Sequence, residues 1–210
     1  MNENVTMPFI AMDRLRMTTD GDGVTTLVAS KGCPLACRYC LNKTVLSESV
    51  PSRPITPQEL FEKVKIDDLY FRATGGGVVF GGGESLLHAR FIAAFAELVP
   101  KDWKILAETC LNVPTDLLSA ALPAVDTWIV DIKDMNPEIY RAYTGQDNAQ
   151  VLKNLRALAE AGRCDDVTIR VPLIPSFNTE EDRLRSVEAV KKIGPFTKFD
   201  LFSYTVRSKI

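Results

Sequence analysis

Three cysteines stand close together near the start of the chain. The stretch KGCPLACRYCLN, residues 31–42, holds Cys33, Cys37 and Cys40 in the spacing C-x3-C-x2-C, and the other two cysteines lie far along the sequence. Thiolates are metal ligands, and three of them leave one position of a four-fold site without a protein donor. An open position is where a bound metal does chemistry rather than only holding a fold.

Three interpretations of this loop differ in what completes the site. Small buried thiols would not require three cysteines in eight residues beside Pro34 and Arg38. A structural zinc site needs a fourth donor, which Cys110, Cys164 or His88 could supply, but zinc ligands usually arrive as C-x2-C pairs. An iron–sulfur cluster accepts three cysteines with one iron left open, so we favour the cluster.

A second candidate stretch, GGGVVFGGGESLLH at residues 75–88, ends an apolar run in glycines. Glycines there let backbone groups approach a ligand closely, because no side chain intervenes. Glu84 follows the glycines directly and precedes a helical pattern. A flexible turn alone would not require that acid, so Gly82, Gly83 and Glu84 are candidate ligand contacts.

The elements that must position these residues alternate along the chain. Short β-branched runs predict strands at 24–30, 77–83, 103–109, 126–132, 166–174 and 198–204. Helical patterns lie at 57–66, 89–99, 114–121, 136–143, 149–161 and 179–193. This alternation predicts an α/β fold with a parallel sheet, and both a doubly wound sheet and an open partial barrel fit it.

In either fold, functional residues gather at the carboxyl ends of the strands. The chemically informative residues fall there. Cys33 follows the first strand, Gly82 to Glu84 the second, Glu108 and Thr109 end the third, Asp131 and Lys133 the fourth, and Arg170 lies in the fifth. This convergence is stronger evidence for one site than any single motif.

Composition excludes several classes of function. The chain has 210 residues, 46% of them hydrophobic, and a net charge of -2, which fits one domain over residues 1–210. No basic stripe indicates nucleic acid, and no apolar run approaches the ~18 residues of a membrane span. The start lacks the pattern of a signal peptide, so we expect a cytoplasmic protein without a disulfide framework.

The cysteine loop, with Tyr39 in C-x3-C-x-aromatic-C, resembles the signature of the radical S-adenosylmethionine (SAM) enzymes. The resemblance implies a 4Fe–4S cluster whose open iron is chelated by the amino and carboxylate groups of SAM. One electron then cleaves SAM to methionine and a 5′-deoxyadenosyl radical, which takes hydrogen from a substrate. The stretch at Gly82, Gly83 and Glu84 resembles the GGE motif of the same family.

The resemblance narrows to the glycyl-radical-enzyme activating enzymes, typified by pyruvate formate-lyase activating enzyme. TTDGDG at 18–23 resembles their T-x-D-G-P-G segment, and VDIKDMNPEIYRAYTG at 130–145 resembles their D-x-K-x-M-x-P-E stretch. RVPLIPSFNTEED at 170–182 resembles their R-x-P-L-I-P-G-x-N segment, with Ser176 in place of glycine. The likeness runs from about residue 18 to 206. It implies a partial (β/α)6 TIM-like barrel in a single domain, preceded by a short N-terminal extension at 1–17.

The resemblance also implies roles for individual residues. The cluster ligands would be Cys33, Cys37 and Cys40, and the SAM site would include Tyr39, Gly82, Gly83, Glu84, Asp131, Lys133 and Arg170. Glu108, Thr109 and Asp131 match a monovalent-cation site, with Glu108 in place of a shorter acid. Asp20 and Lys133 would face the substrate peptide.

Some features depart from the family pattern. ETCLNVP at 108–114 lacks a glycine soon after the threonine, Thr205 replaces a histidine, and the chain stops at Ile210 without a closing helix. No C-x2-C pair lies between residues 41 and 80, which predicts one cluster and no ferredoxin-like insert.

The leading functional prediction is therefore an oxidoreductase that abstracts a glycine hydrogen from a partner glycyl radical enzyme, with a flavodoxin-like reductant as a second partner. One alternative is a radical SAM enzyme that acts directly on a peptide or small molecule. The other is a zinc-binding interaction module without catalysis.

Overall fold

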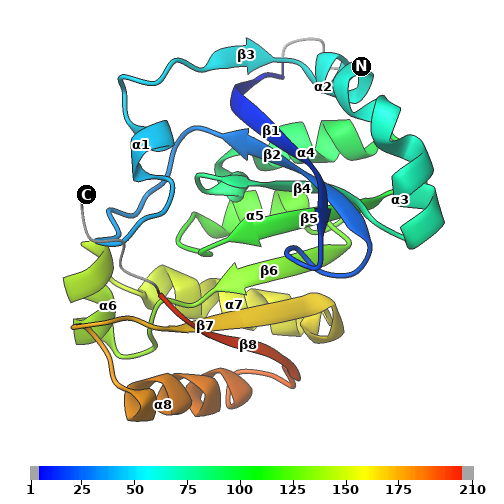
Figure 1. Cartoon of the computed structure of the whole chain (residues 1–210). Helices are drawn as coiled ribbons and strands as arrows, with labels where there is room; N and C mark the ends of the chain where they lie inside the picture. Colours follow the sequence, from blue (N-terminus) through cyan, green and yellow to red (C-terminus); the bar gives the residue numbers. More distant parts are fainter. Residues whose placement is uncertain (1–4, 205–210) are drawn as a thin grey trace. The chain divides into compact units, whose positions relative to one another are not determined.

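The computed structural model describes residues 5–204 (Figure 1). Its strands are β1 Met7–Met17, β2 Val24–Ser30, β3 Arg53–Ile55, β4 Gly77–Gly82, β5 Lys104–Thr109, β6 Thr127–Asp131, β7 Val167–Leu173 and β8 Lys198–Ser203. Its α-helices are α1 Lys43–Leu46, α2 Pro57–Val64, α3 Asp68–Thr74, α4 Ala89–Ala96, α5 Thr115–Ala121, α6 Pro137–Thr144, α7 Ala149–Glu160 and α8 Glu180–Lys191. Short 3-10 turns are η1 Lys65–Asp67, η2 Ser85–His88 and η3 Cys164–Asp166. Thr205 lies outside the described residues.

The six predicted strands all form, as β2 and β4 to β8. Two further strands, β1 and β3, do not belong to the predicted alternation. Most of the predicted N-terminal extension forms β1, which pairs antiparallel with β2 and, at its start, with β3. The stretch after α2 also gains the unpredicted helix α3.

The described residues group into two compact units. The first holds the residues up to Cys33 together with Asn42–Thr109 and Asp116–Ile129. The second holds Pro34–Leu41, Cys110–Thr115 and the residues from Val130 onward. The boundary passes through β6, so that strand contributes residues to both units.

In the first unit the strands follow the order β3-β1-β2-β4-β5. β2 pairs parallel with β4, and β4 pairs parallel with β5, which places Ser30 opposite Gly82 at one end of the sheet. The core is apolar, and Phe80 of β4 meets Phe91 and Phe95 of α4 edge to face at 6.3 and 5.5 Å between ring centroids. Such packing fixes the strand ends from which the candidate residues project.

In the second unit β7 pairs parallel with β8, and α8 packs against β7 (Figure 1). Tyr140 and Tyr143 of α6, Leu155 and Leu158 of α7, and Ile169 of β7 are fully or almost fully buried. The backbone amide of Ile132 donates to the carbonyl of Arg170 at 2.9 Å, which ties the chain after β6 to β7.

Helix starts follow the capping chemistry of the sequence. Thr56 and Glu59 form a reciprocal capping box at α2, and Thr179 and Asp182 form one at α8. Asn136 caps α6 by accepting from the Glu138 amide at 2.9 Å, with Pro137 at the first position. Each cap satisfies amides that the first helical turn leaves without partners.

The predicted α/β class with mostly parallel strands is confirmed. Closure into a partial (β/α)6 barrel and the single-domain organisation stay predictions. None of the helices in residues 5–204 has both the length and the apolar character that crossing a membrane would require.

Candidate functional site

Backbone hydrogen bonds hold the cysteine loop against α6. The amide of Ala36 donates to the Thr144 carbonyl at 2.9 Å, and the amide of Arg38 donates to the Tyr143 carbonyl at 3.1 Å. Both acceptors lie at the carboxyl end of α6, where helical carbonyls lack partners within the helix. Within the loop, the Cys40 amide donates to the Cys37 carbonyl at 3.3 Å. The loop therefore rests on α6 as a defined turn.

Tyr39 anchors this loop by aromatic packing. Its ring lies edge-on to Phe177 at 5.7 Å and tilted against Tyr143 at 6.1 Å between centroids. Such pairs contribute about 0.5–1.5 kcal/mol beyond the area that they bury. Tyr39 thus has a packing role that needs no cofactor, and its predicted contact with SAM stays a prediction.

The three thiols suit a metal cluster by their chemistry and exposure. Cys33 is exposed, and Cys37 and Cys40 are partly exposed, whereas Cys110 and Cys164 are buried. Burial raises the pKa of the Cys164 thiol, which disfavours the thiolate that a metal needs. Among residues 5–204, however, no three His, Cys, Asp or Glu side chains are already arranged around a common metal position. Cluster ligation by the three cysteines stays a prediction.

His88, the alternative zinc donor, is already engaged. Its Nε2 lies 2.9 Å from the carbonyl oxygen of Lys31, the first residue of the cysteine loop. Burial lowers the pKa of His88, so the ring is neutral at pH 7 and Nε2 carries the proton that it donates to the carbonyl. This hydrogen bond therefore positions the backbone at the start of the cysteine loop.

The glycines at the end of β4 allow a close approach of two strand ends. Gly82 has a φ of +85°, and the amide of Gly83 donates to the Ser30 carbonyl at 3.0 Å. A Cβ on Gly83 would lie 2.1 Å from the carbonyl oxygen of Gly32, which no side chain tolerates. The carbonyl of Gly82 accepts from the Asn42 side chain at 2.7 Å. These glycines therefore join β4 to the base of the cysteine loop.

Glu84 has a buried structural role as well. Its amide donates to the Gly32 carbonyl at 2.8 Å, and its carboxylate accepts from the amide of Leu86 at 3.0 Å and from Thr109 Oγ1 at 2.6 Å. The side chain thus caps η2 and links it to the end of β5. The contact of Glu84 with SAM stays a prediction in addition to this structural role.

Glu108 and Thr109 point to opposite faces of β5, because successive side chains of a strand alternate. Thr109 meets Glu84, whereas the Glu108 carboxylate lies beside Gly81, where an added Cβ would come within 2.7 Å of Oε2. A monovalent cation held by both residues would therefore need the backbone carbonyl of Thr109 rather than its hydroxyl.

Asp20 is buried and paired. Its carboxylate accepts from Arg16 Nε at 2.6 Å and Nη2 at 2.8 Å, and from Thr25 Oγ1 at 3.0 Å. The hydrogen bonds to Asp20 raise the pKa of the Arg16 guanidinium above its usual value. Through these hydrogen bonds Asp20 stabilises the loop between β1 and β2. Contact with a substrate peptide stays a prediction.

Asp131 and Lys133 are brought together after β6. The ammonium of Lys133, which is 8% exposed, donates to Asp131 Oδ2 and to Tyr204 Oη, the latter at 3.2 Å. Burial is the largest single influence and disfavours the charge, but the Asp131 carboxylate, Tyr204 and Cys37 together outweigh it and hold the pKa of Lys133 well above its usual value. Lys133 is thus a buried, permanently charged donor.

One oxygen of Asp131 supports a ligand at this position. Oδ1 is buried and has no hydrogen-bond partner among residues 5–204. Buried carboxylate oxygens are normally satisfied, so an unsatisfied one calls for an explanation such as a missing ion or ligand. This residue therefore fits the predicted SAM and cation contacts.

Arg170 projects from β7 toward β8, where its Nε lies 3.3 Å from Asp200 Oδ2. An ion pair between neighbouring strands stabilises the sheet edge. Its predicted role at the SAM site is not tested by this contact.

Sequence reasoning did not assign Arg16, Tyr204 or Asp134. Asp134 is buried and accepts from the Asn136 amide, Ser186 Oγ and Asn178 Nδ2 at 2.9–3.2 Å. Tyr204 lies within the range over which the sequence resembles the family, but its partner Lys133 is 71 positions away in sequence.

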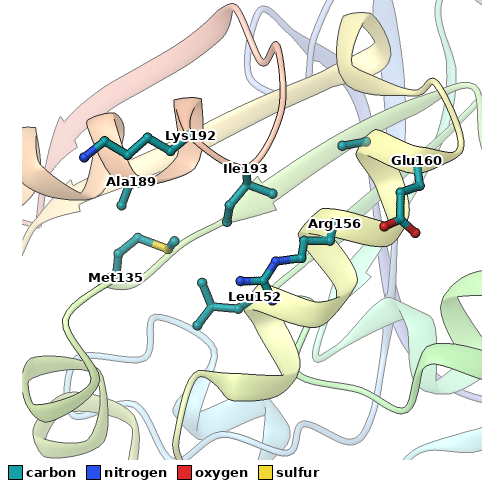
Figure 2. A pocket seen from close by; sticks show the side chains of 8 residues that line it. Met135, Leu152, Arg156, Glu160, Ala189, Lys192 and Ile193 are labelled. Atoms are coloured by element: carbon teal, nitrogen blue, oxygen red, sulfur yellow. The ribbon is translucent and has the colours of Figure 1, made fainter.

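A surface cavity of about 470 Å³ lies between α7 and α8 in the second unit (Figure 2). It is lined by Met135, Leu152, Arg156, Ala159, Glu160, Ala189, Lys192 and Ile193. No predicted site residue lines it, so it is separate from the candidate site.

The comparisons with known proteins identify the family. A family model for the radical SAM superfamily matches residues 27–193. The chain belongs to this superfamily. An isethionate sulfite-lyase activating enzyme of Desulfovibrio desulfuricans is 26% identical, over 88% of this chain and 79% of the relative. A pyruvate formate-lyase-activating enzyme of Staphylococcus aureus is 29% identical, over 89% of this chain and 77% of the relative.

Solved structures share the fold at lower identity. SuiB of Streptococcus suis superposes with a TM-score of 0.66 at 13% identity, over 87% of this chain and 40% of that protein. The coproporphyrinogen III oxidase HemN of Escherichia coli, a radical SAM enzyme, gives 0.51 at 19% identity, over 70% and 36%. The predicted superfamily is thus confirmed, and membership implies a 4Fe–4S cluster and SAM. It favours the iron–sulfur interpretation over a zinc-binding module.

Proposed function

We propose that this radical SAM enzyme activates a glycyl radical enzyme by removing a hydrogen atom from a backbone glycine of that partner. The observation that carries the proposal is the pair of curated relatives. Two activating enzymes with different named targets each align with almost nine tenths of the chain. The bound cluster and SAM would supply the 5′-deoxyadenosyl radical. The chain's own residues would hold these groups and admit the glycine.

Cys33, Cys37 and Cys40 would hold the cluster. Their exposure supports this role, because an inorganic cluster must be inserted and a reductant must reach it. The backbone bonds of Ala36 and Arg38 to α6 would keep the turn in shape before the cluster arrives. A preorganised turn lowers the entropy lost on binding.

Asp131 and Lys133 would hold the polar end of SAM. The unsatisfied Oδ1 of Asp131 can accept from a ligand amino group or bind a monovalent cation, and the Lys133 ammonium can donate to hydroxyl or carboxylate oxygens. Gly82 and Gly83 would hold β4 against the base of the cysteine loop, where any side chain would meet Ala29 or the carbonyl of Gly32.

A glycine target suits this chemistry. The radical left on a glycine α-carbon is delocalised over the two flanking amides, and no side chain blocks access to the hydrogen. The partner would present the glycine on an extended loop. A flavodoxin-like protein would supply the electron, and a monovalent cation would sit beside Asp131.

The experiment is anaerobic reconstitution followed by SAM cleavage. The purified protein should bind about four irons per chain and release 5′-deoxyadenosine when reduced with SAM. A candidate glycyl radical enzyme is then added, and a glycine-centred radical is sought by electron paramagnetic resonance. Free peptides are tested in the same assay, because direct modification of a peptide is the alternative function.

The matched variants are Cys37→Ala and Cys164→Ala. The first should lose iron and 5′-deoxyadenosine formation, whereas the second, at a buried thiol, should retain both. SAM cleavage without a glycyl radical on any partner, together with modification of a free peptide, would contradict the activase function and leave radical SAM chemistry intact.

A further inference from the structure

Tyr204 lies directly after β8 and contacts the ammonium of Lys133. Its hydroxyl oxygen accepts from Lys133 Nζ at 3.2 Å, and the ammonium lies 5.9 Å from the centroid of its ring. The second anchor of the ammonium is Asp131 Oδ2. Lys133 is therefore held by two groups from two different elements.

A lysine needs such anchors to act at a fixed point. Its flexible stem has many rotamers, and the entropy lost must be offset wherever the ammonium is held in one place. The ring of Tyr204 is itself held, because it packs against Phe202 at 5.3 Å and against Tyr143 at 6.1 Å between centroids. Tyr204 thus offers a rigid acceptor.

The arrangement also determines which buried oxygen of Asp131 stays without a hydrogen-bond partner in the protein. Lys133 occupies Oδ2, and Oδ1 has no hydrogen-bond partner among residues 5–204. Without the tyrosine hydroxyl, the ammonium could move along the carboxylate and bridge both oxygens, because three donors on a flexible stem readily do so. The acceptor for a ligand would then be covered.

We infer that Tyr204 is a positioning residue: its hydroxyl holds the Lys133 ammonium away from Asp131 Oδ1 and so keeps the lysine and the carboxylate separately available to SAM. The inference rests on the proposed function, since it assumes that Asp131 and Lys133 contact SAM. It assigns Tyr204 no contact with SAM and no part in the bond cleavage.

The test is a double-mutant cycle on SAM affinity. The dissociation constant for SAM is measured for the reconstituted protein and for Tyr204→Phe, Lys133→Met and the double variant. Tyr204→Phe should weaken binding about three- to tenfold, the effect of one hydrogen bond. In the Lys133→Met background the same change should have no further effect, because the group that Tyr204 positions is absent.

Equal weakening in both backgrounds would overturn the inference, since Tyr204 would then act independently of Lys133. Unchanged affinity in Tyr204→Phe would overturn it as well. Tyr70→Phe, at an exposed tyrosine of α3, is the matched control and should bind SAM as the unaltered protein does. Tyr204→His retains a hydrogen-bonding group and should restore part of the affinity if Tyr204→Phe folds poorly.

A second readout separates this inference from the proposed function. The ligand-free protein is treated with an amine-reactive ester, and labelling of Lys133 is followed by mass spectrometry. Tyr204→Phe should speed labelling of Lys133 severalfold relative to Tyr70→Phe. Unchanged labelling overturns the positioning role even where SAM binds. Faster labelling in a protein that binds no SAM supports the positioning and contradicts the proposed function.

Discussion

Ser176 adopts a backbone conformation that residues with a side chain rarely adopt. It has a φ of +67°, in the left-handed region that glycine adopts without penalty, and it stands where the activating enzymes that the sequence resembles have glycine. A side chain in this region costs roughly 1–2 kcal/mol, partly offset by the greater freedom of an unfolded glycine.

Ser176→Gly should therefore raise the free energy of unfolding by up to about 1 kcal/mol. Denaturant unfolding measures the change. The control is Ser203→Gly in the extended strand β8, where loss of the side chain should destabilise by about 0.5–1 kcal/mol. Destabilisation by both changes would contradict the strain at Ser176.

For Gly83 we predict that a substitution destabilises the protein, because the structure leaves no space for a side chain there. An added Cβ would lie 2.1 Å from the Gly32 carbonyl oxygen and 2.9 Å from that of Ser30, and both are backbone atoms with little freedom to move. Gly83→Ala should destabilise by at least ~2 kcal/mol and reduce iron incorporation, since it displaces the base of the cysteine loop. Gly75→Ala meets no atom within 4 Å, so it should cost only about 1 kcal/mol for its φ of +70°. Thermal melts and iron content distinguish the two.

At the scale of elements, local patterns predicted more than long-range contacts did. The strand at 24–30 coincides with β2, and the predicted helix at 179–193 contains α8, because alternation and capping residues are local signals. β1 was missed since its pairing with β2 is irregular, with register shifts and Leu15 at a φ of +56°, which break the alternation. The hydrogen-bond partners of Asp20 and Lys133 were missed because they depend on tertiary placement.

Asp134 joins three elements of the second unit through one buried carboxylate. It accepts from the amide of Asn136, the N-cap of α6, from Ser186 in α8 and from Asn178 before α8. Burial raises the pKa of Asp134, although these hydrogen bonds oppose the shift. A carboxyl whose pKa is raised on folding binds protons more tightly in the folded state, so its contribution to stability falls as pH rises through the window above the unfolded value of ~3.9.

The unaltered protein should therefore lose stability relative to Asp134→Asn as pH rises from about 4 toward neutrality, because the asparagine cannot ionise. Urea unfolding of both proteins across this range measures the difference. Asp182→Asn serves as the control, since hydrogen bonds from Thr179 lower the pKa of Asp182. The pH dependence of a lowered pKa falls below ~3.9, so this difference should stay nearly constant from about pH 4 to neutrality. A pH-independent difference between the unaltered protein and Asp134→Asn would contradict the raised pKa.

For the molecule as a whole, the cores of both units consist of apolar side chains, and the cysteines predicted to bind the cluster lie at least partly exposed. Hydrophobic burial therefore supplies most of the folding free energy, and a cluster would add function rather than the fold. Removal of iron by chelation should abolish 5′-deoxyadenosine formation while leaving the far-ultraviolet circular dichroism spectrum and a cooperative melt. The Cys37→Ala variant should match the chelated protein in both readouts. Complete unfolding on chelation would show that the metal holds the fold, as structural zinc does in small domains, and would contradict this division of roles.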